Sequence, residues 1–345
     1  MRKFVIITMI AMLAIMTLVA CGRNNDNDTS TEIPSATDND TSQEQNDSPE
    51  SEQPQITDDR FASAEDFHFE YDAQIQGVII IRYIGNDAEV YIPDVIDGNP
   101  VKVIGNSAFM GISEIKEVHI PIGVTHIGNN AFGSSALESV TLPDGLLEIE
   151  SGAFSGTQLT SLEIPDSVTT LGNQAFALTP LTSIVIGNGV TDIDGQFGEA
   201  YVFVITGGIH ETLTDIVIGD GVETIGSGTF SGYSVLTNVT LGKNVTTIET
   251  HAFDRTESLK QIVLPENLKE IEGGAFSQSG LTSILIPGSV ISIGVHAFGF
   301  CNLVDVAFES NDLNIDSYAF GDNPTLSEES RQRILEINPD SYLAK

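Results

Sequence analysis

Short apolar segments that alternate with polar residues recur along most of this chain, and each one predicts a half-buried strand. In one copy, Leu162 and Ile164 alternate with polar neighbours, and Pro165 follows directly. A period of two is typical of a strand with one buried face, and proline or glycine ends such a strand. A second short arm, rich in β-branched residues, follows at 168–172. The pattern therefore predicts two short strands in each unit and no long helix between them.

A phenylalanine, usually preceded by alanine, marks the end of each unit. Consecutive marker phenylalanines are 21 to 23 residues apart, except for one interval of 33 residues. A unit of this length cannot bury its own apolar side, whereas stacked units share one continuous core. The chain is therefore predicted to be mainly β, a solenoid of about ten coils of 22–23 residues. The markers are Phe109, Phe132, Phe154, Phe176, Phe197, Phe230, Phe253, Phe276, Phe298 and Phe320.

Both ends of the repeat region are predicted to be closed, because an exposed solenoid end would leave an unpaired strand edge. Residues 61–100 contain several strand-like segments and are interpreted as a β-rich N-terminal cap on the solenoid at 101–323. Residues 324–345 are interpreted as a C-terminal cap. Within it, a short amphipathic helix is predicted at 326–337, with Thr325 as its N-cap.

The repeated motif resembles the BspA-type leucine-rich repeat of bacterial surface proteins. Its pattern here is Leu-x-x-Ile-x-Ile-Pro-x-x-Val-x-x-Ile-Gly-x-x-Ala-Phe, and it covers about residues 90–323. The sequence Ile-Asp-Gly-Asn-Pro-Val at 96–101 resembles the usual entry to the first repeat of that family. The resemblance implies a leucine-rich-repeat solenoid and a role in attachment, which composition by itself does not show.

The N-terminus predicts export and lipid anchoring. Two basic residues precede an apolar run at 4–18, which is shorter than the ~20 residues that a membrane span needs. The sequence Leu-Val-Ala-Cys at 18–21 resembles a bacterial lipobox, so residues 1–20 are interpreted as a lipoprotein signal peptide and Cys21 as the lipidation site. Ordinary secretion with an incidental cysteine is the alternative. The expected location is the bacterial cell surface, lipid-anchored and extracytoplasmic.

The segment at 21–60 is almost entirely polar and acidic, so it is predicted to be a disordered tether. The whole chain has 49 acidic and 14 basic residues, which gives a formal net charge of −35. This charge repels nucleic acids and anionic lipid head groups, so we expect no nucleic-acid partner and membrane contact only through the lipid anchor. A monomer is expected.

Motifs that carry chemistry are missing from the sequence. It contains no nucleophile elbow, phosphate-binding loop, His-Glu-x-x-His or Cys-x-x-Cys motif, so no enzyme activity, cofactor or metal site is predicted. His119 and His126 flank one turn and make an unconvincing metal pair. Loop carboxylates such as Asp166 and Asp220 are interpreted as a solvated acidic face, with calcium binding as the alternative. Cys301 is interpreted as a small buried apolar side chain, with a reactive or metal-binding thiol as the alternative.

The first candidate for partner binding is the outward face of the first arms. Four outward positions there are apolar, although the core does not require it: Val185, Val217, Val263 and Leu285. Exposed apolar side chains on a regular sheet often mark partner sites. The general preference of strands for β-branched residues is the alternative explanation.

The second candidate is the long unit before Phe230, which gains about eleven residues. Its segment 199–210 carries Tyr201 and Phe203, which suit a contact loop, although a bulge that packs on its own coil is the alternative. The expected function is lipid-anchored adhesion to a protein or glycan of a host or neighbouring cell. A structural or spacer lipoprotein is the alternative, and a substrate-binding or enzymatic lipoprotein is the third.

Overall fold

A computed structural model describes residues 61–195 and 212–344, which belong to a compact unit spanning Thr57–Lys345. Three predictions fall on residues outside the described ranges. These are the signal peptide with Cys21, the tether at 21–60, and the contact loop with Tyr201 and Phe203.

The described chain begins with short strands that lead into the repeats. After a 3-10 turn, η1 (Ala64–Asp66), strand β1 (Phe67–Asp72) pairs antiparallel with β2 (Gly77–Tyr83). Strand β2 then pairs in parallel with β5 (Asn99–Ile104), and β4 (Val95–Ile96) pairs antiparallel with β5. The parallel direction of β5 is the one that all the following coils keep.

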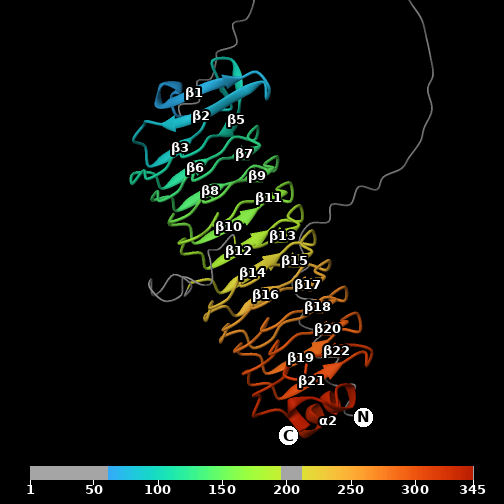
Figure 1. The fold of residues 1–345 in the computed structure, drawn as a ribbon. Coiled ribbons are helices and arrows are strands. Elements are labelled where there is room, and N and C mark those ends of the chain that lie inside the picture. Colours follow the sequence, from blue (N-terminus) through green and yellow to red (C-terminus); the bar gives the residue numbers. More distant parts are fainter. Residues whose placement is uncertain (1–60, 196–211, 345) are drawn as a thin grey trace, which may run out of the picture. The chain divides into compact units, whose positions relative to one another are not determined.

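The first arms of successive coils lie side by side as parallel strands (Figure 1). Within the described ranges they form three ladders, β3-β6-β8, β10-β12-β14-β16 and β19-β21, and the segment around Val263 between the last two is not a strand. The strands are β3 (Glu89–Tyr91), β6 (Glu117–His119), β8 (Ser139–Thr141), β10 (Ser161–Ile164), β12 (Ser183–Ile186), β14 (Asp215–Ile218), β16 (Asn238–Thr240), β19 (Ser283–Ile286) and β21 (Asp305–Phe308).

The second arms are two-residue strands that continue the sheet of β2 and β5 and then form a further sheet. Their parallel pairs join β5-β7-β9-β11 and β13-β15-β17-β18-β20-β22 within the described ranges. The strands are β7 (His126–Ile127), β9 (Glu148–Ile149), β11 (Thr170–Leu171), β13 (Asp192–Ile193), β15 (Thr224–Ile225), β17 (Thr247–Ile248), β18 (Glu270–Ile271), β20 (Ser292–Ile293) and β22 (Asn314–Ile315).

Coils approach each other closely at the glycine turns that follow some of the first arms. Gly219 follows β14, and a Cβ atom on it would lie 2.6 Å from the backbone oxygen of Gly187 in the preceding coil. No real Cβ contact is that short, so a side chain at this position would push the coils apart. The glycines that end the predicted strands therefore also set the spacing between coils.

The marker phenylalanines stack on one another inside the coils. Phe132 and Phe154 have ring centroids 5.3 Å apart and nearly parallel planes, and Phe276 and Phe298 repeat this arrangement at 5.3 Å. These rings are fully buried. Large buried rings supply much of the apolar area that stabilises a fold, and equal spacing in sequence lets them pile up. The predicted fold class, a leucine-rich-repeat solenoid of about ten coils that is mainly β, is confirmed.

A row of buried hydrogen-bond donors lies beside the rings, three residues after most of the described markers. The hydroxyl of Thr157 donates to the Phe154 carbonyl at 2.9 Å, and the hydroxyl of Thr256 does the same to its own marker. Cys301 occupies this position in a later coil, where its thiol donates to the Phe276 carbonyl at 3.1 Å. Cys301 is buried and free, as predicted, but its thiol replaces a serine or threonine hydroxyl rather than an apolar group.

Helix α2 (Glu328–Ile337) covers the last coil and is followed by a 3-10 turn, η3 (Tyr342–Ala344). Its N-cap is Ser327, so the prediction of Thr325 is wrong, because the Thr325 hydroxyl donates instead to the Leu303 carbonyl at 2.9 Å. The hydroxyl of Ser330, in the first turn of α2, accepts the backbone N–H of Val306 in β21 at 2.9 Å. The helix thus takes the place of a next strand. No helix of the described residues has the length and apolar character to cross a bilayer.

Candidate binding surface

The first arms present one column of side chains to solvent, between columns that point into the core. In β12, Ile184 and Ile186 are buried, while Val185 between them is exposed. Because paired strands are in register, the same position of each coil falls in line. We call this column the outward ladder; pairing places Glu163, Val185, Val217, Thr240, Leu285 and Ala307 in it. Val263 is included by its position in the repeat, although its segment is not a strand.

The four apolar side chains predicted to point outward do so. Val185 and Val217 lie directly opposite each other on β12 and β14, and each is about two-fifths exposed. Leu285 on β19 is similarly exposed. Val263 is 71% exposed, because it belongs to the segment that forms no ladder with its neighbours. The surface is therefore a column of aliphatic side chains, with Thr240 in its middle.

Polar side chains border this column and are held in place by bonds between coils. The Asn238 amide donates to the Asp215 carboxylate at 2.6 Å, one column away from Val217. The hydroxyls of Thr214 and Thr237 each donate at 3.1 Å to a backbone carbonyl of the preceding coil. Ordered neighbours keep the column in one conformation, which lowers the entropy lost when a partner binds.

The loop carboxylates considered for calcium have partners in the protein. Asp166 accepts the backbone N–H and the amide of Asn188 in the next coil, and Asp220 accepts Lys243 in the same way. The hydrogen bond and charge of Lys243 hold the pKa of Asp220 below its usual range. These carboxylates therefore connect neighbouring turns.

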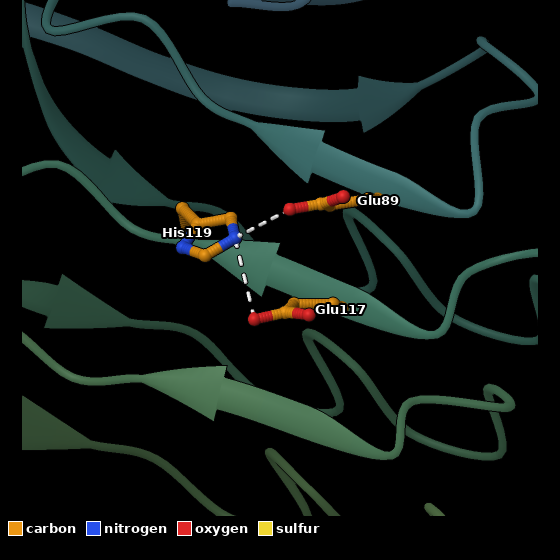
Figure 2. A group of neighbouring side chains, drawn as sticks. All are labelled: Glu89, Glu117 and His119. Carbon is orange, nitrogen blue, oxygen red and sulfur yellow. Dashed lines mark hydrogen bonds and ion pairs between the residues drawn. The ribbon is translucent and has the colours of Figure 1, made fainter. Parts of the chain in front are cut away.

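A separate group of one histidine and two glutamates gathers on β3 and β6 (Figure 2). His119 Nε2 lies 3.2 Å from Glu89 Oε1 and 3.3 Å from Glu117 Oε1. The ligand atoms of these three residues all lie within 4.8 Å of one another. Within the described ranges, no other group of three or more potential metal ligands lies this close together. His119 and His126 are not brought together: His126 lies on β7, with its Nε2 3.8 Å from a Glu148 oxygen.

Tyr91 holds two members of this group in position. Its hydroxyl donates to Glu89 Oε1 at 2.7 Å, and its ring stacks on the His119 ring with centroids 3.8 Å apart and planes 8° from parallel. The hydrogen bond from Tyr91, followed by that from His119, lowers the pKa of Glu89. The carboxylate of Glu89 is therefore kept ionised beside the imidazole.

The grouping of Glu89 with His119 was missed in the sequence because 30 residues separate them, rather than one repeat. A signal was nevertheless present. Glu-Val-Tyr-Ile-Pro at 89–93 and Glu-Val-His-Ile-Pro at 117–121 share a pattern, and the structure pairs these segments in the register that the pattern gives. Treating the first segment as a coil of the ladder would have placed Glu89 opposite Glu117.

Comparison with known proteins gives a family match over most of the chain. A family model described as a BspA type Leucine rich repeat region matches six copies, at residues 90–199 and 209–327. No curated protein matches the chain.

Three solved structures illustrate the similarity. A leucine-rich repeat protein of T. pallidum is 26% identical, with a TM-score of 0.49, over 58% of this chain and 90% of that one. A leucine rich cell surface protein of Faecalibacterium prausnitzii is 20% identical, with a TM-score of 0.31, over 72% and 94%. The pneumococcal vaccine antigen PcpA is 21% identical, with a TM-score of 0.37, over 73% and 76%.

The family model and the coils agree on the same unit, in which two short arms are followed by an Ala-Phe pair whose ring joins the buried stack. The matched residues cover well over half of the sequence. This chain belongs to the BspA-type leucine-rich-repeat family.

Proposed function

We propose that this chain is a cell-surface lipoprotein that binds a protein on a host or neighbouring cell through the outward ladder. The observation that carries the proposal is the exposure of Val185, Val217 and Leu285 on strands whose alternate residues fill the core. Aliphatic side chains in this position are not needed to fill the core, because the alternate residues of the same strands already do so. They provide apolar area that a partner can remove from water.

Charge adds a second element of recognition. The chain has a formal net charge of −35, and Asp215 and Glu163 lie on the same face as the valines. A partner with an aliphatic centre and a basic rim fits this surface, because complementary charge speeds encounter and excludes acidic competitors. Its association rate is expected to fall as salt is added.

The test is a screen of the purified chain against immobilised surface and matrix proteins, with glycans in the same array. We expect a protein ligand, and at least about 10-fold weaker binding by the double variant Val185→Thr, Val217→Thr. Each change replaces a methyl group worth ~0.8 kcal/mol on burial by a hydroxyl that must be desolvated. Threonine is also β-branched, so the strands are kept.

The matched control is Ile122→Thr with Ile291→Thr, because these isoleucines are exposed at 79% and 54% but lie outside the outward ladder. The control should bind like the wild type. Equal binding by the ladder variant would move the partner site elsewhere, and a glycan ligand would change its class. A screen without any ligand, together with an envelope defect when the protein is deleted, would favour a spacer lipoprotein.

Anchoring rests on Cys21 and the apolar run before it. More than one acyl chain gives stable membrane attachment where a single chain is marginal. We expect the wild type in the membrane fraction of the producing cell, with a mass increase on its N-terminal cysteine. Cys21→Ala should release the protein or leave it unprocessed, and an unmodified cysteine in the wild type would refute the anchor.

A further inference from the structure

The group on β3 and β6 combines one imidazole with two carboxylates, donors that zinc-class ions accept together. Glu117 and His119 are two residues apart on β6, so both side chains leave the same face of the strand. Glu89 is the register partner of Glu117 on β3. Two adjacent strands therefore supply three ligand atoms to one point on the surface, as Figure 2 shows.

The distances from His119 Nε2 to the two glutamate oxygens match tetrahedral coordination, and all three ligand atoms lie within 4.8 Å of one another. Ligands bound to zinc at ~2.0–2.2 Å with tetrahedral angles lie about 3.3–3.6 Å from one another. His119 Nε2 lies 3.2 Å and 3.3 Å from the two glutamate oxygens. An ion bound between these three atoms thus requires only small movements of the side chains, which are partly exposed.

The charges in this group also favour a cation. Like charges directly opposite each other on paired strands destabilise a sheet, and Glu89 and Glu117 are such a pair. The next strand of the ladder has Ser139 at this position instead. A divalent ion would neutralise both carboxylates at once, whereas the His119 Nε2 atom can donate only one hydrogen bond between them.

We propose that Glu89, Glu117 and His119 bind one zinc-class divalent cation, with water in the fourth position. Imidazole and carboxylate ligands at this separation suit zinc better than calcium, which prefers six to eight oxygen ligands. Tyr91 orients the set from outside the coordination sphere, since it donates to Glu89 and stacks on His119. Such supporting contacts fix the ligand geometry before the ion arrives. The site is independent of the partner surface formed by the outward valines.

The experiment uses the purified full chain, freed of metal with a chelator and titrated calorimetrically with Zn²⁺ at about 0.15 M salt. The salt suppresses loose attraction of cations to an acidic protein. We expect one tight site per chain, a rise in the melting temperature with Zn²⁺, and visible absorption typical of four-coordination when Co²⁺ replaces it. Ca²⁺ should not compete at equal concentration.

His119→Ala and Glu117→Gln should each weaken Zn²⁺ binding by at least about 10-fold and abolish the thermal shift. Glu117→Gln keeps the shape of the side chain, so it tests the site if the histidine variant folds poorly. The matched control is His126→Ala, which should leave the isotherm unchanged, since His126 lies on β7, in another sheet than the cluster, and faces a single carboxylate there. Equal Zn²⁺ affinity in His119→Ala and the wild type, or wild-type binding no tighter than for Ca²⁺, would overturn the proposal and leave an ion-pair cluster.

Discussion

Asp254 directly follows the marker Phe253, in a position that the next two coils fill with Ser277 and Gly299. Its side chain is buried, and its Oδ1 atom has no hydrogen-bond partner within the described part of the chain. Desolvation by burial raises the pKa of Asp254, an effect that the nearby charges of His251 and Arg255 oppose. An ionised Asp254 therefore works against the fold.

The consequence is a pH dependence with a definite sign. The folded chain holds the Asp254 proton more tightly than the unfolded chain, whose pKa stays near 3.8. The free energy of unfolding should therefore fall as pH rises from about that value through the raised pKa. Asp254→Ser should remove this loss and stabilise the protein at pH 7 by about 1–3 kcal/mol, which is typical for removing an unsatisfied buried group.

Urea denaturation of the wild type and Asp254→Ser over a series of pH values measures this effect. Asp312→Ser is the control, because Asp312 is exposed and its substitution should leave the curve parallel to that of the wild type. If the free energies of unfolding of the wild type and Asp254→Ser differ by the same amount at every pH, Asp254 is not the titrating group.

The strands show how far local pattern determines structure. Alternation around Leu162 and Ile164 predicted both the strand and its buried face, because each coil meets neighbours of the same kind and no other packing competes. The outward orientation of Val185 and Val217 follows from the same period. Repetition thus makes the strands and the outward ladder readable from the sequence.

Elements at the ends of the repeats were less predictable, because contacts between coils decide them. The helix was expected, yet the Thr325 hydroxyl donates to the Leu303 carbonyl of the preceding coil, so Ser327 caps the helix instead. The cluster of Glu89 with His119 depends on the register between β3 and β6, where the usual repeat length does not apply. Local sequence carries the type of each element but not the partner that a terminal element meets.

For the whole unit of stacked coils, stability is expected to be a sum of coil and neighbour terms. Removing residues 277–298, one 22-residue period from after Phe276 to Phe298, would bring Phe276 onto Phe320. We expect this variant to fold with one cooperative transition at a modestly lower melting temperature. Removing 277–287, half a period, should prevent folding of the C-terminal coils because it puts polar residues in core positions.

Circular dichroism and thermal unfolding of both deletion variants measure this difference. The half-period variant is the control for loss of residues as such, since it removes fewer of them. Equal damage from both deletions would mean that the coils are not interchangeable and that longer-range contacts hold the unit together.

Helix α2 has a consequence for how such a protein can change size over generations. Its Ser330 hydroxyl already accepts the Val306 N–H, and Ser327 donates its own backbone N–H to the Val304 carbonyl, so β21 offers little to an added strand. A repeat added after the helix would therefore have no unpaired strand edge to pair with. A tandem duplication inside the gene, in contrast, inserts a coil between two matching faces, so a lineage carrying this architecture lengthens from within.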